Sequence, residues 1–236
     1  MKRSIKFVIL HVMSRIEVLG VKIDNYSFRD AVLIAEEYLG NMAVNIVQSV
    51  SIDSLNVAEA NEELKAFLES VDLTVISDIG ILPIIGADSE DRIREIEESY
   101  FEKTFIRRIR ETGKSVYLLA PSNEEKDAIE DFLKREEVSL NILNTKIVLD
   151  DGNPIDWEDV VNEINSQSVG IVISLLPVSL NQQLMKDYKD MLSIELFWGL
   201  GEAVKFLGKN SGIIDGIKQS FLSKVFHHKA SKYSEE

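Results

Sequence analysis

The polar side chains best placed to do chemistry follow short apolar runs of the chain. Asp78 directly follows the apolar run 72–77 and is the one aspartate that ends a clearly buried strand in the pattern. A carboxylate in such a position can serve as the acid or base of an enzyme. Polar residues after other apolar runs are candidates for ligand contact, because ligands of α/β proteins bind at strand ends. These candidates are Ser49, Ser51, Ser77, the segment 120–122 and the segment 174–183, which contains Asn181 and Gln182.

Several other kinds of catalytic site are excluded by what the chain lacks. It has no cysteine, which excludes disulfides, thiolate metal sites and a cysteine nucleophile. The three histidines, His11, His227 and His228, lie near the two ends, so a Ser–His–Asp triad would need a terminal histidine. There is no Walker loop, dinucleotide fingerprint, zinc-binding H-E-x-x-H or nucleophile elbow. We therefore expect neither a metal site nor a bound cofactor.

Strand-like and helix-like segments alternate along the chain. The strand-like runs are short and continuously apolar, which indicates a parallel sheet covered by helices on both faces. The sequence thus predicts a Rossmann-like α/β fold, preceded by a strand or hairpin arm over 16–23. The expected later strands are 45–50, 72–77, 115–120, 140–143, 169–175 and 194–197. The expected helices are 28–39, 52–68, 88–112, 123–136, 157–166 and 181–191.

Composition and charge indicate a folded, acidic protein that does not bind nucleic acid. The chain has 236 residues, 45% of them hydrophobic, which suits a folded domain. A net charge of −14 argues against nucleic-acid binding, because phosphates need a basic face. The apolar stretch 7–13 is far too short to span a bilayer, and we expect a cytoplasmic protein. We divide the chain into an N-terminal extension (1–15), an α/β domain (16–202) and a C-terminal appendage (203–236).

The appendage differs from the rest of the chain in charge. Residues 203–232 carry six lysines and one acid, Asp215, and apolar residues recur there at offsets of three and four. One interpretation is a helix that lies on an anionic membrane through Lys218, Phe221, Lys224 and Phe226. The other is a helix that docks on the protein's own core, and the pattern alone favours this second interpretation.

Several segments resemble one family, the WecB/TagA/CpsF glycosyltransferases. Residues 16–25 (IEVLGVKIDN) resemble the family's opening motif, 72–80 (DLTVISDIG) resemble its A-D-L-V-L-P-D-G-I-G segment, and 115–120 (SVYLLA) resemble its R-V-F-L-L-G strand. The likeness runs from about residue 16 to the C-terminus. It implies transfer of an N-acetylhexosamine from a UDP-sugar donor to a lipid-linked acceptor in cell-surface polysaccharide synthesis. It also favours a peripheral position at the inner face of the plasma membrane.

The motif residues depart from the family pattern. Ser49 stands at the family's threonine and Ser51 at its asparagine, while Ser77 stands where the family's proposed catalytic base stands. Asp78 replaces the following glycine, and a shift of one residue would return it to the catalytic position. The family's phosphate-loop glycines are absent, as is the lysine of its K-Q-E motif, in the segment that ends with Asn181 and Gln182. These losses remove room and donors for a diphosphate.

Three hypotheses follow. In the first, a divergent transferase uses Asp78 as base or sugar contact, Ser49 and Ser51 for the sugar or acceptor, and Asn181 and Gln182 on the nucleotide side. In the second, an inactive homologue serves as a binding or scaffold protein, and a homo-oligomer is possible in either case. In the third and weakest, the chain is an unrelated Rossmann-like binder of small molecules. Helix capping competes with these site roles for Asp78, Ser49, Ser51 and Asn181.

Overall fold

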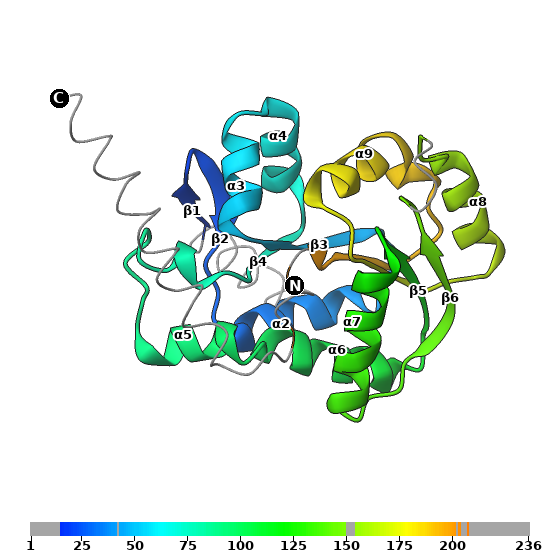
Figure 1. Cartoon of the computed structure of the whole chain (residues 1–236), viewed down its shortest axis with the longest axis horizontal. Coiled ribbons are helices and arrows are strands. Elements are labelled where there is room, and N and C mark those ends of the chain that lie inside the picture. Colours follow the sequence, from blue (N-terminus) through cyan, green and yellow to red (C-terminus); the bar gives the residue numbers. More distant parts are fainter. Residues whose placement is uncertain (1–14, 42, 150–153, 202, 204–206, 208–236) are drawn as a thin grey trace, which may run out of the picture.

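A six-stranded parallel sheet forms the centre of the protein in the computed structural model (Figure 1). The structure describes residues 15–41, 43–149, 154–201, 203 and 207. The strand order is β4-β3-β8-β7-β5-β6, and each neighbouring pair is parallel. The strands are β3 (Asn45–Val50), β4 (Leu73–Ile76), β5 (Ser115–Ala120), β6 (Asn141–Ile147), β7 (Ile171–Ser174) and β8 (Leu196–Gly199).

Helices cover both faces of this sheet (Figure 1). One face carries α3 (Ile52–Glu59), α4 (Glu62–Ser70), α8 (Trp157–Ser166) and α9 (Val178–Tyr188). The other carries α2 (Phe28–Tyr38), α6 (Tyr100–Thr112) and α7 (Asn123–Arg135). The described chain also contains three further short helical elements, namely η1 (Ile79–Ile81), α5 (Glu90–Glu97) and η2 (Lys189–Met191). The predicted Rossmann-like α/β fold is therefore confirmed.

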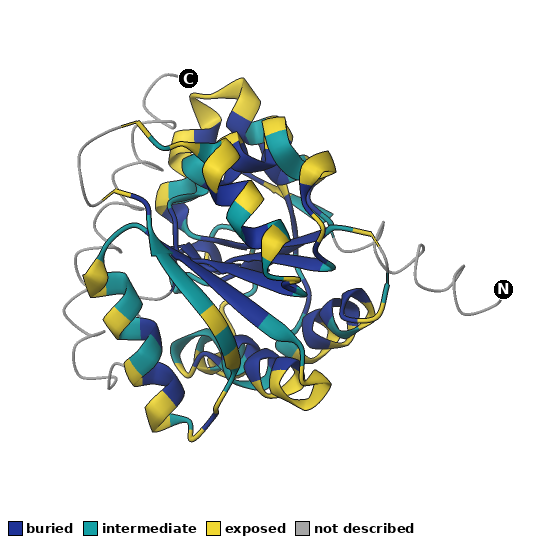
Figure 2. Cartoon of the chain, turned by 90° about the vertical axis from the view of Figure 1, so that its right-hand side faces the viewer, coloured by how far each residue is buried: buried dark blue, intermediate teal, exposed yellow. Residues whose placement is uncertain are grey.

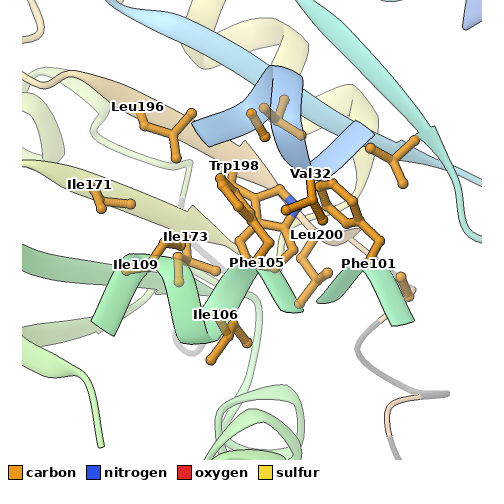
Figure 3. Close-up of a cluster of buried hydrophobic side chains, with 14 of the residues drawn as sticks. Val32, Phe101, Phe105, Ile106, Ile109, Ile171, Ile173, Leu196, Trp198 and Leu200 are labelled. Carbon is orange, nitrogen blue, oxygen red and sulfur yellow. The ribbon is translucent and has the colours of Figure 1, made fainter. Parts of the chain in front are cut away.

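Burial follows the layers. The inner strands are buried along their length, and each surrounding helix has a buried side toward the sheet and an exposed side toward solvent (Figure 2). On the α6 face, the Trp198 ring packs edge-on against Phe101 and Phe105, with ring centroids 5.9 and 5.2 Å apart (Figure 3). This aromatic group joins β8 to the first turns of α6.

A two-stranded hairpin shields the edge of the sheet at β4. It consists of β1 (Arg15–Val18) and β2 (Val21–Asp24). The buried Asp24 carboxylate accepts hydrogen bonds from the Thr74 N–H (2.9 Å) and hydroxyl (3.1 Å), and Arg15 pairs with it from outside. Because Asp24 and Thr74 satisfy each other, this edge is not left open for pairing with another strand.

Two helices expected from the sequence are each broken in two. The span 52–68 divides into α3 and α4 because Asn61 caps a new helix, accepting a hydrogen bond from the Leu64 N–H. The span 88–112 divides into α5 and α6 at Ser99, which adopts a left-handed conformation with φ of 52°. Both breaks occur inside continuous amphipathic patterns, which periodicity alone does not resolve.

Two predictions concern residues outside the described part of the chain. The proposed membrane-contact residues Lys218, Phe221, Lys224 and Phe226 lie there, as do most of the extension and appendage. The domain boundaries therefore stay predictions. Among the residues that are described, no helix has both the length and the hydrophobicity required for a membrane span.

Candidate active site at the strand ends

A cleft lies where β3, β4 and β8 end. It holds about 560 Å³ of empty space, part of it open to solvent. The chain leaving β3 turns toward β4, while β8 pairs with the other side of β3. This reversal of direction is where α/β folds bind ligands. The polar residues that line the cleft are Gln48, Ser49, Ser51, Asp53, Ser54, Ser77 and Ser179.

The Ser49 hydroxyl lines this cleft without a hydrogen-bond partner among the described residues. The side chain is buried, and its Oγ makes no hydrogen bond in the described part of the protein. Buried polar atoms almost always have a partner, so an exception needs an explanation. A bound hydroxyl or amide group of a ligand would supply the missing partner. The structure therefore brings the predicted Ser49 into the cleft with an unused hydrogen-bonding group.

Ser51 and Asp78 are each helix caps: Ser51 caps α3, and Asp78 caps η1. Ser51 begins α3 with a reciprocal capping box, in which its Oγ accepts the Ser54 N–H at 3.2 Å. Asp78 begins η1 and binds with both carboxylate oxygens, accepting the N–H of Gly80 at 2.8 Å and that of Ile52 at 3.1 Å. The capping alternative is confirmed for both residues. Burial raises the pKa of Asp78, and these two backbone N–H groups oppose the rise.

Ser77 stands between the cleft and a second cavity, and lines both. Its hydroxyl donates to the Val50 carbonyl oxygen at 3.0 Å, which ties β4 to β3. Asp78 is not among the residues that line either cavity. Ser77 and Asp78 are the two candidates for the position of the family's catalytic base. The structure thus places the Ser77 hydroxyl at the cleft and uses the Asp78 carboxylate as a helix cap.

Asn181 lies beneath the cleft instead of inside it. It sits in the first turns of α9, fully buried, so the expectation that it caps this helix is wrong. Its Nδ2 donates to Gln48 Oε1 at 3.1 Å, and its Oδ1 accepts the Ser174 hydroxyl at 2.6 Å. Gln48 in turn donates to the Gly199 carbonyl oxygen at 3.0 Å. This amide network binds α9 to strands β3, β7 and β8.

Gln182 points to another part of the surface. It lines a groove between α4 and α9, together with Phe67, Met185 and Lys186. The structure therefore does not bring the two predicted residues Asn181 and Gln182 into the cleft. Ser179, two residues nearer the start of α9, is the polar residue of this segment that lines it.

The helices α3, α7, α8 and α9 each follow a strand of the central sheet, and α9 differs from the other three. Ser51, Ser122 and Asp156 cap α3, α7 and α8, and each of these helices has an acidic residue in its first turn. Pro177 precedes α9 and provides no side-chain cap, and the first turn of α9 has no acid. Val178 and Ser179 line the cleft, and no side chain at the N-cap position engages their N–H groups. Uncapped helix N-termini bind anions.

A comparison with known proteins identifies the family. The model of the Glycosyl transferase WecG/TagA/CpsF family matches residues 16–211. The chain belongs to this family. Membership supports a glycosyl-transferring activity, and the match covers the described strands and helices apart from the first residue of β1. A search of curated proteins finds no match.

Membership makes the strand-end cleft the candidate active site. Sequence reasoning found Ser49, Ser51 and Ser77 there, and it included Ser179 only within the segment 174–183, from which it chose Asn181 and Gln182. It missed Gln48 and the turn at Gly201. Pro177, which cannot continue a strand ladder, was the available signal for an earlier start of α9. None of the lining residues carries a positive charge, so an anionic ligand would depend on N–H groups and hydroxyls here. The described residues contain no group of metal-binding side chains.

Proposed function

We propose that this protein transfers an N-acetylhexosamine from a UDP-sugar to a lipid-linked acceptor, with the donor in the strand-end cleft. The observation that carries the proposal is the uncapped N-terminus of α9 at the cleft. A diphosphate bears negative charge, and the aligned peptide dipoles of α9 favour that charge near the N–H groups of Val178 and Ser179. Family membership supplies the class of reaction.

The other lining residues fit the sugar end of such a donor. The unpartnered Ser49 hydroxyl is available to a sugar hydroxyl or acetamido group, and Ser77 offers a second hydroxyl nearby. Asp53 brings a carboxylate to the same wall of the cleft. Carboxylates and hydroxyls both hydrogen-bond to sugars, and the Asp53 carboxylate would repel a phosphate, so we place the diphosphate near α9 and the sugar near β3 and β4.

The acceptor side of the proposal concerns the appendage. Its lysines and apolar residues suit the inner surface of a membrane that contains anionic lipids. We expect the full chain to bind anionic liposomes, and this binding to weaken as salt is added. Removal of residues 211–236 should abolish the binding, and unchanged binding would refute the membrane assignment.

The donor site is tested by calorimetric titration with UDP. We expect the full chain to bind UDP, Ser179→Trp to abolish binding by filling the cleft, and Ser70→Trp to leave it intact. Ser70 lines the groove between α4 and α9 and serves as the matched control. Absence of binding at millimolar UDP would overturn the proposed function. Equal affinity in wild type and Ser179→Trp would place the nucleotide elsewhere.

An inactive homologue is the second candidate. The observation in its favour is that both carboxylate oxygens of Asp78 are occupied by backbone N–H groups, while the family's base position holds Ser77. A serine cannot act as a general base near neutral pH. UDP binding without sugar transfer from UDP-N-acetylhexosamine donors to a lipid-diphosphoryl sugar would favour this candidate.

A further inference from the structure

A second buried carboxylate lies close to the strand ends. Glu102, in the first turn of α6, is 6% exposed. It lines a cavity enclosed by the ends of β2 and β4 and by α2, α5 and α6, elements that adjoin in Figure 1. Ser77 lines this cavity too, and it also lines the donor cleft. Glu102 is therefore one of three carboxylates, with Asp24 and Glu95, that line a cavity adjoining the donor cleft at Ser77.

The Glu102 carboxylate has fewer interactions than the other charged side chains that line this cavity. Its carboxylate accepts a hydrogen bond from its own N–H, and no ion pair to it is present in the described part of the chain. Arg92, the cation of the cavity, is already engaged with Glu95 at 2.6 Å and with the Tyr26 carbonyl oxygen. Asp24, also in the cavity, is held by Thr74.

The surroundings of Glu102 keep its proton affinity high. Burial raises the pKa of Glu102 to about 7, while its own N–H and the nearby Lys103 act in the opposite direction. The other charged groups that face the cavity are Asp24 on β2 and Arg92 and Glu95 on α5. A carboxylate with a pKa near the working pH exchanges protons most effectively in catalysis.

We propose that Glu102 is the general base of the transfer reaction, in place of the carboxylate missing at Ser77. The proposal rests on the proposed function. The acceptor hydroxyl oxygen bonds to the anomeric carbon of the donor sugar, and the bond from that carbon to the UDP oxygen breaks. The electron pair of the broken bond leaves on UDP, and the hydroxyl proton passes to the Glu102 carboxylate. The products are the glycosylated acceptor, UDP and protonated Glu102.

Asp78 is the competing carboxylate, and its geometry is less suitable. It lines neither cavity, and its two oxygens hold the N-termini of η1 and α3. Within the described residues, the hydrogen bond of the Glu102 carboxylate is to its own N–H, and it caps no other helix. We therefore assign a structural role to Asp78 and a catalytic role to Glu102. The isosteric amide variants Asp78→Asn and Glu102→Gln test this assignment.

The experiment measures UDP affinity and the pH profile of sugar transfer in the full chain and four variants: Glu102→Gln, Glu102→Asp, Glu111→Gln and Asp78→Asn. The donor is UDP-N-acetylmannosamine and the acceptor a lipid-diphosphoryl-N-acetylhexosamine in detergent. Glu102→Gln should lower kcat at least about 100-fold and remove the rise of kcat/KM through pH 7. Glu102→Asp should retain that rise at reduced kcat. Glu111→Gln, on the exposed side of the same helix, should match wild type.

Calorimetry separates failure of this inference from failure of the proposed function. We expect Glu102→Gln to bind UDP within about twofold of wild type, since the base contacts the acceptor. A wild type that does not bind UDP defeats the proposed function. If UDP binds, the base assignment is overturned by a smaller loss of kcat, by survival of the pH 7 rise in Glu102→Gln, or by a wild type inactive at pH 8. Loss of that rise in Asp78→Asn instead would identify Asp78 as the base.

Discussion

The helices α3 and α9 begin at the same cleft and are built in opposite ways. The start of α3 is closed by the Ser51 capping box, by Asp78 and by the acidic Asp53. The start of α9 has no side-chain cap and no acid, and a buried amide network through Asn181 holds the helix in place from below. The contrast shows that α9 is fixed without using its N-terminal donors, which leaves them for a ligand.

The largest expected effect comes from crowding the network under α9. A Cβ added at Gly199 would collide with Gln48 Oε1 and lie 2.7 Å from Asn181 Nδ2. We expect Gly199→Ala to lower the free energy of unfolding by about 3 kcal/mol. Gly40→Ala, where a Cβ meets open space, is the control for urea denaturation. A loss below 1 kcal/mol would mean that the network does not anchor α9.

Removing an amide from the network tests the same anchor more gently. Asn181→Leu leaves the Gln48 and Ser174 side chains without their partner, and we expect a loss of about 2 kcal/mol in unfolding free energy. The exposed Gln183→Leu, on the same helix, should change stability by less than about 0.5 kcal/mol. Equal losses in the two variants would contradict the anchoring role.

Adding an acid to α9 should make its start resemble that of α3. Ser179→Glu places a carboxylate beside the uncapped N–H groups, where it competes with a diphosphate. We expect UDP affinity to fall at least about tenfold and thermal stability to rise slightly. Ser179→Gln has nearly the same size without the charge, and it should bind UDP better than Ser179→Glu in calorimetry. Equal affinities would show that charge at α9 is irrelevant to binding.

The smallest effect is expected from opening α3. Ser51→Ala removes the accepting oxygen for the Ser54 N–H, and we expect unfolding free energy to fall by about 1 kcal/mol. UDP affinity should stay within about twofold of wild type, because Asp78 still occupies the Ile52 N–H. A tenfold change in UDP affinity would mean that the start of α3, as well as that of α9, takes part in nucleotide binding.

The same contrast explains which parts of the fold the sequence predicts. The pattern places the starts of α2, α7 and α8 at residues 28, 123 and 157, as in the structure, because a capping side chain stands before each. It places the start of α9 at 181, three residues late, because no such side chain precedes it. The start of α9 thus lacks the capping signal that marks those three starts in the sequence.

The candidate site is predicted less completely for a related reason. Ser49 and Ser77 were found because each lies at the end of a strand that its apolar pattern marks as buried. The Asn181–Gln48 pair joins residues 133 positions apart, and Gln48 reaches Gly199 across 151 positions. Glu102 is hidden inside a charged amphipathic run until Ser99 breaks it and the turn is buried. Such partnerships depend on tertiary packing and leave no local periodic trace.

The most direct test of the account is a map of backbone amide chemical shifts as UDP is added to the isotope-labelled protein. The account predicts the largest shifts at Val178 and Ser179, with further shifts at Ser49 and Ser77, and little change in the groove at Ser70. Shifts centred on that groove, or on the capped start of α3 alone, would contradict a donor site at the open end of α9. No shifts at millimolar UDP would contradict nucleotide-sugar binding altogether.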